Sequence, residues 1–231
     1  MLSVSNLEVS IGGSRILRGV NLEVPPKSVM CLMGRNGVGK TTTLRAIVGL
    51  AKAGKGSITL DGQSLDGLSP EERARRGIGY VPQGREIFPH LTVDENLRIG
   101  AIARGKKLNG QLDRVFTLFP ILKEFLPRKG GMLSGGQQQQ LAIGRALLTE
   151  PKILILDEPT EGIQPNVIEQ IGDTIRLLRE EGKMSILLVE QYLAFIDELA
   201  DYFAILDRGA VVAEGPAEAL TVQIIQAHLL V

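Results

Sequence analysis

The residues with the clearest potential for chemistry lie between Gly34 and Thr41, where the sequence reads GRNGVGKT. This spacing matches G-x-x-x-x-G-K-[ST], and it follows an apolar run and precedes a helical pattern, as a phosphate-binding loop should. Glycines let successive backbone N–H groups face phosphate oxygens, a lysine reaches the β and γ phosphates, and the next hydroxyl ligates Mg²⁺. The predicted nucleotide-binding residues are Gly34, Arg35, Asn36, Gly37, Val38, Gly39, Lys40, Thr41 and Thr42, and Thr41 is also a predicted magnesium ligand.

A second candidate element is the apolar run ILILDEP, which contains the adjacent carboxylates Asp157 and Glu158. Two carboxylates at the end of a buried strand are costly unless they meet a cation or water, so we expect them at the carboxyl edge of the sheet. Asp157 fits a magnesium ligand, and Glu158 fits the residue that orients or deprotonates an attacking water. Such a pair is more often a helix cap or surface charge when it occurs alone, but the phosphate loop favours the catalytic interpretation.

The third element, LSGGQQQQLAIGRAL, passes from Ser134 and two glycines through four glutamines into a helical pattern. A short glutamine tract can also be a flexible linker. The apolar spacing of Leu141, Ile143, Ala146 and Leu147 instead indicates one buried face of a helix. A Ser-Gly-Gly entry to a helix N-terminus can hold an anion, because its N–H groups are unpaired and no bulky side chain blocks them.

The composition narrows the choice of partners. Twenty-six basic and 26 acidic residues give a formal net charge of zero, so no global field attracts nucleic acid or an acidic membrane. Cys31 is the single cysteine, which excludes an intrachain disulfide and fits a reducing compartment. The first residues lack a leader pattern, and no window approaches about 18 continuous apolar residues. We expect a cytosolic protein with no membrane span of its own and no nucleic-acid partner.

The elements that must position the motifs change in character along the chain. The first sixty residues alternate apolar and polar with Gly or Pro punctuation, which is typical of short strands and tight turns. From SVMCLMG onward, apolar runs alternate with glycine loops and helical patterns, which indicates a mostly parallel sheet covered on both faces. Residues 85–148 show helical patterns only. We predict a single α/β domain over residues 1–231, with its core and β subdomain in 1–84 and 149–231 and an inserted helical subdomain in 85–148.

The phosphate loop, Gln83 in YVPQG, the LSGGQ element and ILILDEP together closely resemble the ATP-binding cassette (ABC) transporter ATPase family over nearly the whole chain. The resemblance implies a P-loop NTPase fold with an N-terminal antiparallel β subdomain, and ATP and Mg²⁺ as cofactors. It makes Gln83 a catalytic residue and a magnesium ligand. It also makes the LSGGQ element a contact to ATP held by a second cassette, and Gln138 to Gln140 only the polar first turn of its helix. The residues implied in that contact are Ser134, Gly135, Gly136 and Gln137.

The resemblance also implies partners. One chain carries one phosphate loop and one signature element, so a complete site requires a second cassette, either an identical copy or a sibling. The family further implies two integral membrane permease subunits and, indirectly, a periplasmic solute-binding protein, which would place this chain on the inner face of the cell membrane. Phe88 and Pro89 lie where the family docks its membrane subunits, although they could equally be core residues.

Three positions depart from the family pattern. Ile11 stands where an aromatic residue usually stacks on adenine, so it offers apolar contact but no π face. Gln191, in LLVEQYL, stands at the switch histidine and is predicted to be a catalytic hydrogen-bond donor that carries no charge. Gln164, in EPTEGIQP, stands where the family has an aspartate. These departures bear on the rate and leave the reaction type in place.

The subgroup is indicated by three of the same stretches. VEQ at the switch resembles cassettes of branched-chain amino acid importers, and GGQQQQLAIGRAL with EPTEGIQP most resembles the urea-importer member of that group. We therefore predict an ATP-hydrolysing subunit that energises an importer for urea, branched-chain amino acids or amides. The alternatives are a cassette of another importer, an ATP-gated dimerising module with negligible hydrolysis because Gln191 replaces histidine, and a soluble cassette in DNA repair or translation. Intact Glu158 argues against the binding module.

Overall fold

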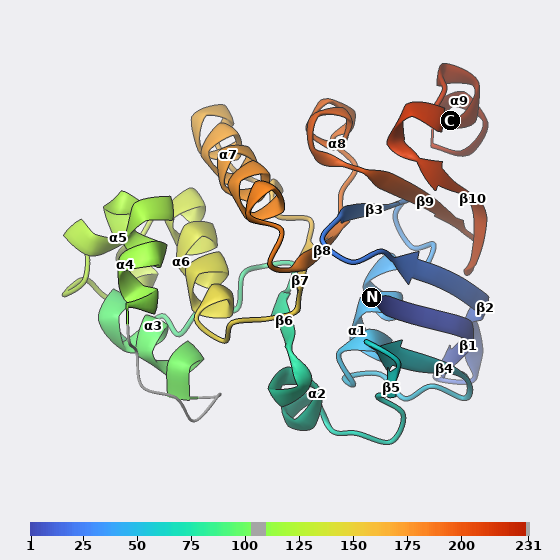
Figure 1. Ribbon diagram of the computed structural model, residues 1–231, viewed down its shortest axis with the longest axis horizontal. Coiled ribbons are helices and arrows are strands. Elements are labelled where there is room, and N and C mark those ends of the chain that lie inside the picture. Colours follow the sequence, from blue (N-terminus) through green and yellow to red (C-terminus); the bar gives the residue numbers. More distant parts are fainter. Residues whose placement is uncertain (103–109, 230–231) are drawn as a thin grey trace.

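The computed structural model describes residues 1–102 and 110–229 (Figure 1). In these ranges the N-terminal part forms an antiparallel sheet of order β2-β1-β4-β5. Inward side chains of its strands, such as Val4 and Leu22, are buried, and their neighbours along the strand are more exposed. The alternation of apolar and polar residues in the sequence, which predicted short strands, therefore corresponds to a sheet with one buried face. The strands are β1 (Leu2–Ile11), β2 (Ser14–Val24), β4 (Lys55–Leu60) and β5 (Gln63–Ser64).

A second, mostly parallel sheet carries the predicted motifs. Its order within the described residues is β10-β9-β3-β8-β7-β6, and all of its strand pairs except β10 with β9 are parallel. The antiparallel edge strand β10 was not predicted, because its sequence AVVAEGP mixes small, acidic and glycine residues. The strands are β3 (Val29–Met33), β6 (Ile78–Val81), β7 (Ile153–Asp157), β8 (Ser185–Val189), β9 (Tyr202–Asp207) and β10 (Ala210–Pro216).

Both faces of this sheet are covered, as its continuous apolar strands predict. In β3, Cys31 belongs to one buried apolar cluster and Leu32 to the other. The same alternation in β7 places Leu154 in the first cluster and Ile155 in the second. Because side chains alternate along a strand, one sheet separates two cores. The rigid layer between them fixes the carboxyl ends of β3, β7 and β8, where the candidate site lies.

Helices flank the parallel sheet and follow its strands. Figure 1 shows α7 and α8 beside the carboxyl-terminal strands, and α1 between the parallel sheet and the antiparallel one. None of the helices in the described part of the chain is long and apolar enough to cross a membrane. These helices are α1 (Lys40–Ile47), α2 (Pro70–Arg76), α7 (Pro165–Glu181), α8 (Leu193–Leu199) and α9 (Val222–His228).

The described residues between 85 and 148 form helices and no strand. Figure 1 shows them gathered at the end of the molecule opposite the antiparallel sheet. The stretch LDRVFTLFPILKEFL, whose apolar spacing is helical, forms two helices, because Phe119 precedes a proline and takes φ −134° and ψ 75°, which ends one helix and lets Pro120 begin the next. The boundaries 85–148 remain a prediction, and residues 103–109 lie outside the described part. The helices are α3 (Val93–Ile102), α4 (Gln111–Leu118), α5 (Pro120–Glu124) and α6 (Gly135–Leu147).

Candidate active site

The predicted phosphate loop joins the end of β3 to the start of α1 and can only be built with glycine at two positions. Gly34 has φ 144°, and a Cβ there would lie 2.4 Å from the Leu206 carbonyl oxygen. Gly39 has φ 113°, and a Cβ there would lie 2.7 Å from Leu17 Cδ2. Both values fall where L-residues are strained, and both sites lack space. The glycines of the motif therefore give the loop its shape.

Lys40, the first residue of α1, is held over this loop. Its side chain is only 5% exposed, and its Nζ donates to the carbonyl oxygens of Gly34 at 2.7 Å and Arg35 at 3.0 Å. Nζ also lies 3.7 Å from Glu158 Oε1. Burial lowers the pKa of Lys40, while the carboxylate of Glu158 opposes that shift. A buried ammonium fixed at the mouth of a helix N-terminus is arranged to bind phosphate oxygens.

Asp157, the last residue of β7, fits a cation ligand. Its side chain is 1% exposed, and neither carboxylate oxygen has a hydrogen-bond partner within the described residues. Burial first, and then the charge of Glu158, raise its pKa to about 6, although Thr41 and Lys40 oppose the shift. An unpartnered buried carboxylate beside a threonine hydroxyl is a donor set that Mg²⁺ prefers. Thr41 and Asp157 are therefore the residues that would hold magnesium.

The raised pKa of Asp157 predicts how stability depends on pH. The folded carboxyl binds its proton more tightly than the unfolded one, about 6 against 3.8, so this group destabilises the fold above pH ~6 and ceases to do so as the pH falls toward 4. We expect thermal melts without magnesium or nucleotide to show wild type losing stability relative to Asp157→Asn as the pH rises from ~4 to ~7. The change should be on the order of 2 kcal/mol. A gap that is constant with pH would contradict the assignment.

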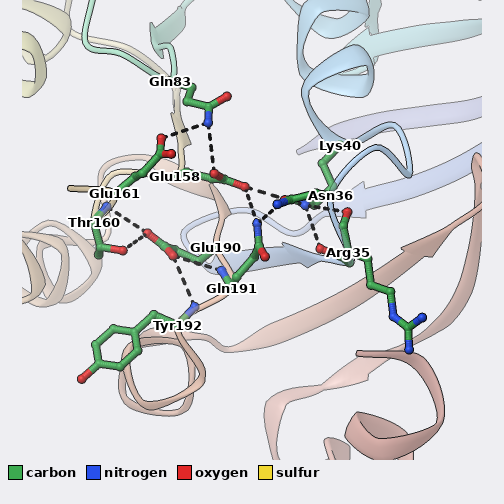
Figure 2. Close-up of polar contacts among 11 residues, drawn as sticks. Arg35, Asn36, Lys40, Gln83, Glu158, Thr160, Glu161, Glu190, Gln191 and Tyr192 are labelled. Carbon is green, nitrogen blue, oxygen red and sulfur yellow. Dashed lines mark hydrogen bonds and ion pairs between the residues drawn. The ribbon is translucent and has the colours of Figure 1, made fainter. Parts of the chain in front are cut away.

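Glu158 lies at the centre of a network that contains all three predicted catalytic residues (Figure 2). Its Oε1 accepts from Gln191 Nε2 at 2.7 Å, and its Oε2 accepts from Gln83 Nε2 at 3.3 Å. Its backbone has φ 48°, a strained value for a non-glycine residue, and its N–H donates to the Val189 carbonyl at 2.9 Å. Strained backbone of this kind is concentrated at functional sites. The arrangement directs the carboxylate toward the phosphate loop.

Gln191, which follows β8, connects that carboxylate to the loop. Its Nε2 donates to Asn36 Oδ1 at 2.8 Å as well as to Glu158. The geometry therefore places a neutral amide donor between the phosphate loop and the carboxylate of Glu158. Because an amide does not titrate in the accessible pH range, this donor keeps the same charge at every working pH.

A cavity of about 640 Å³ brings half of the predicted site residues together. Ile11 lies on its rim at the end of β1, and its side chain is 54% exposed. The cavity can hold a nucleotide-sized ligand, because its lining includes apolar surface at Ile11 and Ile16 and charged groups at Lys40, Glu158 and Glu161. Its lining is Ile11, Ser14, Ile16, Asn36, Gly37, Gly39, Lys40, Thr41, Thr42, Gln83, Glu158 and Glu161.

The signature residues lie elsewhere. Ser134 is the N-cap of α6, and it forms a reciprocal capping box in which Ser134 Oγ accepts from the Gln137 N–H and Gln137 Oε1 accepts from the Ser134 N–H. None of the four signature residues, Ser134, Gly135, Gly136 and Gln137, lines the cavity that holds Lys40. They therefore lie outside the cavity that contains the phosphate loop.

The interpretation of the glutamine run was wrong in part. Gln139 and Gln140 are each 3% exposed, so they are buried and do not form a solvated first turn. Gln140 Nε2 donates to Gln170 Oε1 on α7 at 2.7 Å. Gln138 Nε2 donates to the Leu133 carbonyl at 3.2 Å. The run therefore fixes α6 against its own entry and against α7.

Four residues of the network were not predicted from the sequence: Thr160, Glu161, Glu190 and Tyr192. Glu161 Oε2 accepts from Gln83 Nε2 at 2.9 Å, and Glu190 accepts from Thr160 and Gln191 (Figure 2). Glu190 carried a usable signal, because it directly follows an apolar strand, just as Glu158 does. Thr160 and Glu161 carried none, since they belong to a loop whose course the sequence does not define. Gln164 is the exposed N-cap of α7 and makes no side-chain cap bond.

A phosphate loop after one parallel strand and a carboxylate pair at the end of another define a P-loop nucleotide-hydrolysing protein. A family model described as ABC transporter matches residues 17–161. The chain belongs to the ABC transporter family and is an ABC-type ATPase, so the predicted fold class and activity are confirmed.

Its relatives are transport ATP-binding proteins. It is 41% identical to the high-affinity branched-chain amino acid transport ATP-binding protein BraG of Pseudomonas aeruginosa, over 95% of this chain and 94% of BraG. It is 38% identical to the probable branched-chain amino acid transport ATP-binding protein LivF of Archaeoglobus fulgidus, over 95% and 94%. The dimeric post-hydrolysis state of the cassette MJ0796, bound to ADP and Pi, superposes with a TM-score of 0.83 at 27% identity, over 94% of this chain and 99% of that one.

Proposed function

We propose that this chain energises an importer, working as a pair of cassettes that close around two molecules of Mg-ATP. The observation that carries the proposal is the Glu158 carboxylate, which is hydrogen-bonded to Gln191 and Gln83 and faces the buried ammonium of Lys40. Glu158 is the group that accepts a proton from, or orients, the water that attacks the γ-phosphate. Bound magnesium would supply charge stabilisation to the phosphates, held by Thr41 and Asp157, with Gln83 nearby.

The other site residues have positioning roles in this proposal. The loop N–H groups and Lys40 bind the β and γ phosphates. Ile11 offers apolar contact to the adenine. Gln191 donates a hydrogen bond to the γ-phosphate or to the attacking water, in addition to its contact with Glu158. Because Gln191 is neutral, its donation does not depend on pH.

A second cassette completes each site. In this proposal the α6 N-terminus, with Ser134 to Gln137, contacts ATP held by the partner cassette. The phosphate groups of that ATP are the anion that the helix N-terminus binds. The capping box supports this role, because it fixes the entry of the helix without using a bulky side chain. The partner is a second copy of this chain or a sibling cassette.

The permease subunits have a candidate docking surface. An apolar groove of about 670 Å³ lies between α2 and β6 on one side and α3 and α6 on the other. Phe88 lies in it and is 44% exposed, so it is a surface residue and not core. Leu50, which also lines it, is 53% exposed. We infer that a short apolar helix of a permease subunit packs here, which would hold the chain at the inner face of the cell membrane.

For the solute we propose a branched-chain amino acid or urea, in a system with a periplasmic binding protein. The named relatives support the first, and the stretches GGQQQQLAIGRAL and EPTEGIQP support the second. Proteoliposomes that contain this chain, its permease subunits and its binding protein should hydrolyse ATP about 3- to 10-fold faster with either leucine or urea present. Maltose serves as the control solute and should give no increase. Stimulation by neither leucine nor urea would contradict the solute assignment.

A further inference from the structure

A buried carboxylate with no assigned role, that of Glu190, lies directly behind the catalytic network. It follows β8, and its side chain is 3% exposed. Its Oε1 accepts from the Thr160 N–H at 3.0 Å and from Thr160 Oγ1 at 2.7 Å. Its Oε2 accepts from the N–H groups of Gln191 at 3.0 Å and Tyr192 at 3.4 Å. Both carboxylate oxygens therefore hold backbone, one in each of two loops (Figure 2).

These two loops carry the residues that meet at the reacting centre. Thr160 belongs to the loop that begins at Glu158, after β7, and Gln191 begins the loop after β8. Across the gap, Gln191 Nε2 donates to Glu158 Oε1. The Glu190 carboxylate thus holds both loops that carry the partners of the Gln191 to Glu158 hydrogen bond: it binds Gln191 itself in one loop and Thr160, two residues after Glu158, in the other. A buried carboxylate is costly unless it is hydrogen-bonded on this scale, which explains why all four donors converge on it.

Position 190 requires a side chain with two hydrogen-bond acceptors, one facing each loop. Three of its four partners are backbone N–H groups, which can only donate. A glutamine at 190 can present its oxygen to only one loop, and its NH₂ group would then face N–H donors of the other loop. Glutamine is therefore an isosteric replacement that releases one of the two loops without opening a cavity.

We propose that Glu190 is a positioning residue, which fixes the Gln191 amide against Glu158 for hydrolysis without touching the nucleotide. The inference rests on the proposed roles of Glu158 and Gln191. None of the hydrogen bonds described for the Glu190 side chain reaches residues 34–42, and its link to the phosphate loop is the weaker one of its charge, which opposes the lowering of the pKa of Lys40 by burial.

The first test is Glu190→Gln in the full chain, assayed for steady-state ATP hydrolysis. We expect kcat to fall about 10- to 100-fold, because a small misplacement of a catalytic group has effects of this size. The KM for ATP should stay within about threefold, since the phosphate loop is unchanged. Asp201→Asn is the matched control. Asp201 also accepts a backbone N–H, from Val29 at 2.8 Å, and it pairs with Arg179, but it contacts neither Thr160 nor Gln191. It should leave kcat and KM within about twofold.

A double-mutant comparison shows whether Glu190 acts through Gln191. In a Gln191→Ala background, where the positioned amide is absent, Glu190→Gln should lower kcat by less than about threefold. Should Glu190→Gln fail to fold, Thr160→Val removes one of the four bonds and should lower kcat about 3- to 10-fold, again with KM preserved. Wild-type kcat in Glu190→Gln or in a folded Thr160→Val, or fully multiplicative effects with Gln191→Ala, would overturn the inference. A wild-type chain with no Glu158-dependent hydrolysis would instead overturn the proposed function.

Discussion

Replacing Lys40 with alanine should abolish tight Mg-ATP binding. Lys40 is the buried cation that the loop holds at the mouth of α1, and its two carbonyl contacts keep it there. Charge-assisted hydrogen bonds to two phosphates contribute about 3 to 4 kcal/mol together, so Kd should rise roughly 100- to 1,000-fold. Titration calorimetry with a non-hydrolysable ATP analogue measures this directly. Lys55→Ala, at an exposed lysine 3.7 Å from Glu8, should leave Kd unchanged. Wild-type affinity in Lys40→Ala would refute the phosphate-loop assignment.

Lys40→Ala, combined with a second variant, also tests whether each nucleotide site is shared between two chains. Ser134→Arg should bind ATP normally as a monomer but fail to hydrolyse it, because the arginine blocks the face that meets the partner's nucleotide. An equal mixture of Lys40→Ala and Ser134→Arg forms some mixed dimers with one intact site, since the intact loop and the intact signature then meet. Activity should return to roughly a quarter of wild type or less, well above either variant alone. No recovery, with dimers present, would contradict the shared site.

The phosphate loop and the two strand-end motifs could be predicted because their geometry is local. Gly34 and Gly39 adopt backbone conformations that only glycine takes without strain. These conformations shape the loop, and the lysine that follows it must then lie over the loop. Asp157, Glu158 and Gln191 end neighbouring parallel strands, so the edge of the sheet brings them together whatever surrounds it.

The parts of the site that could not be predicted depend on contacts between distant segments, and no local sequence pattern defines such contacts. Glu161 contacts Gln83 across 78 positions of sequence, and Gln140 contacts Gln170 across 30, so the burial of Gln139 and Gln140 could not be predicted from the run itself. The two-loop contact of Glu190 similarly depends on how the Thr160 loop returns to the sheet.

Replacing Glu158 with glutamine should nearly stop hydrolysis while preserving ATP binding. The side chain keeps its size and can still accept from Gln191, but an amide does not take a proton from water. Loss of a general base typically costs about 100- to 10,000-fold in turnover. Affinity for Mg-ATP should stay within about threefold, since Lys40, Thr41 and the loop are unchanged. Glu169→Gln, on the exposed side of α7, is the matched control and should retain wild-type turnover.

The most direct test of the account is therefore steady-state ATP hydrolysis by the purified chain and by Glu158→Gln, at saturating Mg-ATP and equal protein concentration. The account predicts measurable turnover by the wild type and a rate at least about 100-fold lower in the variant, with both proteins binding ATP. Equal rates in the two proteins would contradict it. In that case the chain would bind and dimerise on ATP without using Glu158 as a base, and the importer would be driven by its partner cassette.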